Sequence, residues 1–155
     1  MKALPSLMVG ALLLAASTAG ASEGRWLITP DEAASAGDFA ASPLDPAAAG
    51  EGGPAIVVEH PKLLERLHPP VNIRVYFRPG ESGLAPDMSS LTVTLRGFIT
   101  IDLTDRLREY LRGNELAVEE ADLPTGRHRI RLAISDIGGN LSARDMMLTV
   151  VEREQ

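Results

Sequence analysis

Between residues 55 and 151 the chain repeatedly places an apolar side chain at every second position, and this alternation constrains the fold more than any other feature. In the clearest run the apolar members are Val71, Ile73, Val75 and Phe77. Side chains of a β-strand point alternately to its two faces, so such a run predicts a strand with one buried and one solvated face. Comparable runs at 56–59, 91–95, 98–101, 115–120, 130–134 and 146–150 bring the prediction to about seven strands.

One helix is predicted among these strands, at residues 104–112. Asp102 or Thr104 can cap its start, and Gly113 can end it. Its apolar face would consist of Leu103, Leu107, Tyr110 and Leu111. We expect this helix to cover a sheet edge that would otherwise pair with another chain. The sequence therefore predicts an all-β sandwich with one short inserted helix, because only one connection is long enough for the crossover that parallel strands need.

Residues 123–140, LPTGRHRIRLAISDIGGN, resemble the penultimate hairpin of the immunoglobulin-like domains of exported bacterial proteins. Those domains commonly show L-x-x-G-x-H/Y, an alternating strand and a D-x-x-G-N turn. The likeness extends over 56–151 and includes the proline-led run at 69–75. It implies an immunoglobulin-like β-sandwich for residues 55–155, although the chain has no cysteine and its single tryptophan, Trp26, precedes that range.

Five residues of this motif are expected to shape its turns: Gly126, His128, Asp136, Gly139 and Asn140. Glycine and asparagine tolerate the positive φ angles that a chain reversal requires, and Asp136 can accept backbone N–H bonds that fix the turn. His128 stands where many sandwiches have a corner tyrosine that bonds back to the chain. We therefore interpret these residues as structural.

Residues 1–21 have the pattern of a cleavable secretory signal peptide. Lys2 supplies the positive start, an apolar stretch rich in leucine and alanine follows, and the segment ends on the small triplet Ala19-Gly20-Ala21. The apolar stretch is shorter than a membrane span needs, and no second one follows. We expect cleavage after Ala21 and a periplasmic or secreted protein without a membrane span.

Residues 22–54 are rich in alanine, glycine and proline and hold six acidic residues against one arginine. Such a composition buries too little apolar surface to offset the entropy of ordering it, which predicts a disordered acidic tether. One island interrupts the tether at Trp26-Leu27-Ile28, where Thr29 could cap a short helix that begins at Pro30. This island could dock on a partner or on the domain itself.

The sequence argues against several classes of function. Its net charge is −6 and it has no basic footprint, which excludes a nucleic-acid-binding protein. It has no nucleophile elbow, phosphate loop or H-E-x-x-H motif, so we predict neither an enzyme nor a cofactor. His60 and His68 flank a proline-bounded loop, but two histidines without a third ligand make a weak metal site. Oxygen ligands for Ca²⁺ are available in a spacing that matches no EF-hand loop, and we predict no metal at Asp102, Asp105, Glu109, Asp136 and Asn140.

Arginine supplies the remaining candidate site. Several polar side chains point outward from predicted strands, and we take them as a candidate interaction face: Arg74, Tyr76, Arg96, Arg129 and Arg131. If the strand of Arg74 neighbours that of Arg129 and Arg131, as in the family pattern, the arginines form one cationic stripe that can bind carboxylates or polyanions. The alternative is an ordinary solvated face paired with local glutamates.

We therefore expect an exported, non-enzymatic immunoglobulin-like module that engages an unknown envelope or extracellular protein through a sheet face or edge. The alternatives are a carbohydrate- or ligand-binding accessory sandwich and a Ca²⁺-dependent adhesion module. Tyr76 is the only outward aromatic residue on a predicted strand, which disfavours a carbohydrate platform.

Overall fold

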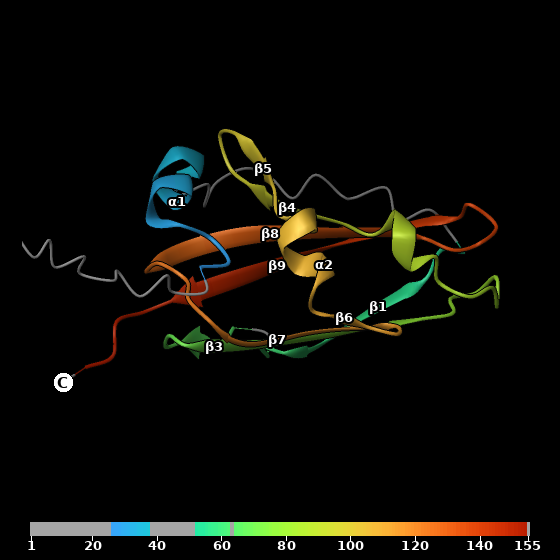
Figure 1. Cartoon of the computed structure of the whole chain (residues 1–155), viewed down its shortest axis with the longest axis horizontal. Helices are drawn as coiled ribbons and strands as arrows, with labels where there is room; N and C mark the ends of the chain where they lie inside the picture. The colour runs from blue at the N-terminus through green and yellow to red at the C-terminus, as the bar shows by residue number, and fades with distance from the viewer. Residues whose placement is uncertain (1–25, 38–51, 63, 155) are drawn as a thin grey trace, which may run out of the picture.

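The computed structural model describes residues 26–37, 52–62 and 64–154, which form two β-sheets that face each other across one core (Figure 1). The all-β prediction is confirmed. The predicted signal peptide and the tether residues 22–25 and 38–51 lie outside the described residues.

The first sheet has four strands in the order β1-β3-β7-β6, and every neighbouring pair is antiparallel. Its members are β1 (Ala55–His60), β3 (Val71–Arg78), β7 (Glu115–Ala121) and β6 (Leu111–Arg112). The second sheet has five strands in the order β2-β9-β8-β4-β5. Its members are β2 (Arg66–Leu67), β9 (Leu141–Val150), β8 (Gly126–Ser135), β4 (Thr92–Arg96) and β5 (Thr100–Asp102). Only the pairing of β2 with β9 is parallel among the described strands.

The alternating residues meet between the two sheets as predicted. From the four-stranded sheet, Val75 and Phe77 are almost fully buried, and from the five-stranded sheet Leu132 and Leu148 are equally buried. Their outward neighbours, such as Arg131, keep some exposure. Burial of one face of each sheet is the main source of stability in a chain with no disulfide.

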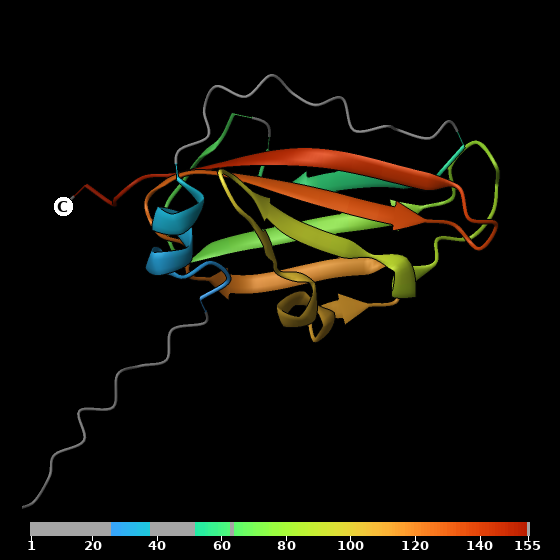
Figure 2. The ribbon, with the colours of Figure 1, turned by 90° about the horizontal axis from the view of Figure 1, so that it is seen from above.

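The island at residues 26–37 docks on the domain and is not part of an extended tether. Leu27 and Ile28 enter the core, and Leu27 N donates to Asp122 O at 3.1 Å beyond the end of β7. Helix α1 (Pro30–Ala36) follows, with Thr29 and Glu32 forming a reciprocal capping box. Figure 2 shows α1 at the end of the domain where β4 and β5 meet. The folded unit thus begins earlier than the predicted boundary at residue 55.

Gly97, which lies between β4 and β5, allows this docking. A Cβ atom at Gly97 would lie 2.2 Å from the carbonyl oxygen of Ala36, which is too close for any other residue. The neighbouring Phe98 N donates to that oxygen at 2.8 Å. The absence of a side chain at Gly97 therefore lets the end of α1 contact the β4–β5 hairpin.

The predicted helix at 104–112 is shorter than expected. Helix α2 (Thr104–Arg108) ends early, and the chain continues into β6, so Leu111 forms part of a strand. Asp102 Oδ1 accepts from Thr104 N at 2.8 Å, while Leu103 and Leu107 are buried. The predicted helix was too long because Tyr110 and Leu111 also pack against the core and so fit a helical spacing of apolar residues. In the structure, Tyr110 lies in a turn and Leu111 in a strand. The short strands β2 and β6 and the 3-10 turn Met88–Ser90 were not predicted.

Candidate interaction surfaces

Arg74 and Tyr76 lie on the outer face of the four-stranded sheet, apart from the other residues of the predicted interaction face. Arg74 Nε is 3.1 Å from Glu115 Oε1, and its Nη1 is 3.9 Å from Glu59 Oε2. The guanidinium of Arg78 lies 5.9 Å from the centroid of the Tyr76 ring. Arg74 thus belongs to a mixed-charge surface, in agreement with the alternative of local pairing with glutamates.

Arg96, Arg129 and Arg131 lie on the outer face of the five-stranded sheet. The condition for a single arginine stripe is therefore not met, because β3 belongs to one sheet whereas β4 and β8 belong to the other. The five-stranded sheet still gathers positive charge by itself, since Arg127 is a further outward residue of β8. We call the outer surface of β4, β5, β8 and β9 the cationic face; its charged residues are Arg96, Arg127, Arg129, Arg131, Asp102 and Asp145.

Asp145 on β9 binds two of these arginines, and no local sequence motif indicates this contact. Its Oδ2 accepts from Arg129 Nε at 2.9 Å and from Arg129 Nη2 at 2.6 Å. Its Oδ1 accepts from Arg131 Nε at 2.7 Å. The side chains of Arg129, Asp145 and Arg131 are 8, 14 and 16% exposed. Burial acts to raise the pKa of Asp145, but the bonds from Arg131 and Arg129 outweigh it, and the pKa lies below its usual value.

Arg96 stands directly opposite Arg129 in the pairing of β4 with β8. Like charges directly opposite each other in a sheet are destabilising. Asp145 offsets the charge of Arg129 only in part, because it is shared with Arg131. A pattern that breaks a local rule of stability is typical of a functional surface.

The turn between β8 and β9 is held by Asp136, which is almost fully buried. Its Oδ1 accepts from Gly138 N at 2.9 Å and from Asn140 N at 3.0 Å. Its Oδ2 accepts from Ser82 Oγ at 2.6 Å, which joins the turn to the loop after β3. Hydrogen bonds from Ser82 and Asn140 lower the pKa of Asp136 to about 2. Gly139 has a φ of 85°, so this position needs a residue that tolerates left-handed backbone.

His128 lies at the start of β8 and contacts the chain that leads into it. Its Nε2 donates to the carbonyl oxygen of Pro124 at 2.7 Å, and the residue is buried. Gly126 precedes it with a φ of 129°. The histidine therefore bonds backward to the chain segment that leads into its own strand.

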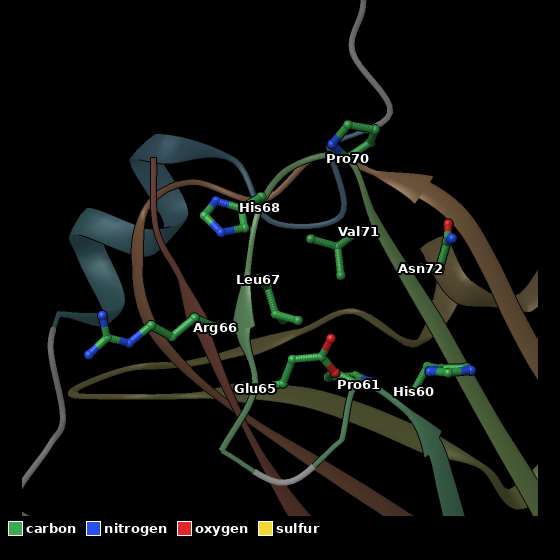
Figure 3. A pocket seen from close by; sticks show the side chains of 9 residues that line it. All are labelled: His60, Pro61, Glu65, Arg66, Leu67, His68, Pro70, Val71 and Asn72. Atoms are coloured by element: carbon green, nitrogen blue, oxygen red, sulfur yellow. The ribbon is translucent and has the colours of Figure 1, made fainter. Parts of the chain in front are cut away.

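A surface cleft of about 320 Å³ lies where the chain crosses from β1 in one sheet to β2 in the other (Figure 3). His60 and His68 line it at opposite ends, and Glu65, Leu67 and Val71 are among its other lining residues. The two histidines therefore do not converge. Within the described residues no group of three or more His, Asp or Glu side chains is placed to hold a metal ion.

The oxygen-ligand candidates around α2 are engaged in local structure. Asp102 bonds to the backbone of Thr104, and Asp105 Oδ1 lies 3.1 Å from Arg108 Nε. Hydrogen bonds with Thr104 lower the pKa of Asp102. These carboxylates cap and pair with their own helix, and Asp136 and Asn140 act together in a separate turn.

Comparison of the chain with protein-family models, curated proteins and solved structures gives no match. Neither helix in the described part of the chain has the length and apolar character of a membrane span.

Proposed function

We propose that this chain is an exported, non-catalytic binding module with an immunoglobulin-like sandwich, and that it engages an envelope or extracellular protein through the cationic face. Export rests on the pattern of residues 1–21. The partner contacts the outer surface of β4, β8 and β9, on which the four arginines lie.

The strand order supports the immunoglobulin-like assignment. In that fold the first, second, fifth and fourth strands share one sheet, and the third, sixth and seventh share the other. The arrangement β1-β3-β7-β6 against β9-β8-β4 follows this order when β2 and β5 are counted as additional edge strands. The hydrogen bond from His128 to Pro124 O at the start of β8 and the turn built on Asp136 after it support the same assignment.

The observation that carries the binding role is the difference in charge between the two outer faces. The four-stranded face interleaves both signs, as Arg74 with Glu115 and Glu59 illustrates. The cationic face has four arginines and two aspartates, in a chain whose net charge is −6. A concentration of charge opposite in sign to the whole molecule steers a complementary partner to that face.

Affinity capture from envelope extract tests this role with two charge-reversal variants of the tagged full chain. The first variant is Arg96→Glu with Arg127→Glu on the cationic face. The matched control is Arg74→Glu with Arg78→Glu on the opposite sheet. We expect the first variant to lose proteins that the wild type and the control retain. Identical captured sets for both variants would refute the proposal.

A further inference from the structure

The cationic face is ordered in rows that run across the strands. One row contains Arg96, Arg129 and Met147, on β4, β8 and β9 respectively. The next row contains Thr94, Arg131 and Asp145, on the same strands. Residues two apart on a strand are about 7 Å apart, so adjacent rows are close enough for one extended ligand to touch both.

Asp145 fixes the orientation of the Arg129 guanidinium. It takes the Nε edge of that group, with contacts of 2.9 Å to Nε and 2.6 Å to Nη2. Arg131 holds the carboxylate from the other side through its own Nε. Nη1 of Arg129 stays outside this contact. A guanidinium held in one plane loses little further freedom when it binds a second carboxylate.

We propose that Arg96 and Arg129 form a binding site for carboxylates, and that their ligands are glutamate or aspartate side chains of an acidic segment in the partner protein. This inference rests on the proposed function, whose binding surface it specifies. Arg96 brings a second cation opposite Arg129, and the planar guanidinium matches the geometry of a carboxylate. Arg131 and Asp145 are positioning residues.

The uncharged neighbours of the site favour a peptide over a sulfated polysaccharide. Met147 is 47% exposed beside Arg129 and can cover the methylene groups of a glutamate side chain. Ala133 and Ala143 pair two rows further along β8 and leave a low, uncharged surface there. A densely sulfated chain would need further cations at these positions.

A fluorescein-labelled octaglutamate peptide provides the direct test, with fluorescence anisotropy measured on the full chain. Arg96→Gln should weaken binding about tenfold, which is the loss of one charge-assisted contact. Arg96→Lys keeps the charge and loses the guanidinium, and should still weaken binding severalfold. Arg74→Gln on the other sheet is the matched control and should bind like the wild type. Equal affinity for all four proteins, or full affinity of Arg96→Lys, would overturn the site.

Asp145→Asn separates positioning from simple charge attraction. This change makes the face more positive, so unspecific attraction predicts tighter binding, whereas loss of the guanidinium orientation predicts weaker binding. We expect weaker binding, and tighter binding would overturn the role of Asp145. Circular dichroism checks the fold. If this variant does not fold, Arg96→Lys distinguishes guanidinium geometry from simple charge attraction, because it keeps the charge and removes the guanidinium.

Two further arms identify the ligand. The measurements are repeated on a variant that combines Asp38→Asn, Asp45→Asn and Glu51→Gln, so that these carboxylates of the chain cannot compete with octaglutamate. If octaglutamate does not bind this variant, the inference is refuted. A heparin fragment that binds more tightly than octaglutamate and depends equally on Arg96 would overturn the peptide assignment. If capture of the partner requires Arg96 but octaglutamate does not bind, the proposed function is retained and the carboxylate site is refuted.

Discussion

Glu32 and Arg106 join the two helices, and their removal should release the N-terminal segment from the domain. Arg106 Nη1 donates to Glu32 Oε2 at 2.7 Å and to the carbonyl oxygen of Leu27 at 3.1 Å, and its Nη2 pairs with Glu32 Oε1. Glu32 also accepts from the backbone N–H of Thr29 in the capping box. A single carboxylate therefore holds both the start of α1 and its contact with α2.

The pKa of Glu32 gives the size of this effect. The hydrogen bond from Arg106 lowers that pKa from 4.5 to about 2, which corresponds to about 3 kcal/mol if fully expressed. The Arg106 side chain is 40% exposed and that of Glu32 21%, so solvent screening reduces the expected contribution to about 1 to 2 kcal/mol. In a domain of this size the melting temperature should fall by about 5 to 10 °C.

A double-mutant cycle with Glu32→Gln and Arg106→Gln, followed by urea unfolding, measures the coupling between the two side chains. Trp26 is the only tryptophan and lies in the docked segment, so its fluorescence reports release of that segment. Because the folded pKa of Glu32 is lowered, the stabilisation is fully present above about pH 4.5 and is lost as the pH falls toward 2. A coupling energy below about 0.3 kcal/mol at neutral pH, or a coupling that persists unchanged at pH 2, would refute this reasoning.

Three further changes test other parts of the fold. Gly97→Ala should displace α1, because the new methyl group would meet Ala36 O at 2.2 Å, and increased proteolysis before residue 52 would register it; unchanged proteolysis would contradict the close contact. Ile28→Ala should cost about 3 kcal/mol in urea unfolding, since Ile28 is fully buried, and a loss below about 1 kcal/mol would mean that the segment adds little to the core. Asp136→Asn should lower the melting temperature at neutral pH and have a smaller effect near pH 2, because the lowered pKa of Asp136 stabilises the fold only while the carboxylate is ionised; an equal effect at both pH values would argue against this role.

The strands were predictable because their cause is local. Alternation at Val71, Val75 and Phe77 requires only that one face be buried, and the structure buries that face. The two-residue strands β2 and β6 lack a local cause, since neither is long enough to show a period. Their pairing depends on neighbours brought close by the rest of the fold.

The candidate site was predictable only in its residue types. Outward arginines follow from the alternation, but the sheet to which each strand belongs depends on topology, and Arg74 was therefore grouped with the wrong neighbours. Asp145 is distant in sequence from the arginines that it binds, so no motif connects them. Thr29 and Glu32 did carry a local signal, the spacing of a capping box, but the polar and alanine-rich composition around them favoured a tether.

The described segments on either side of residues 38–51 both pack on the same domain. Gly37 lies against the Phe98 ring at the β4–β5 hairpin, and Gly53 lies against Leu141 and Ser142 at the beginning of β9. Residues 26–37 therefore belong to the same domain as the later described residues through packing and hydrogen bonds as well as through the continuous chain.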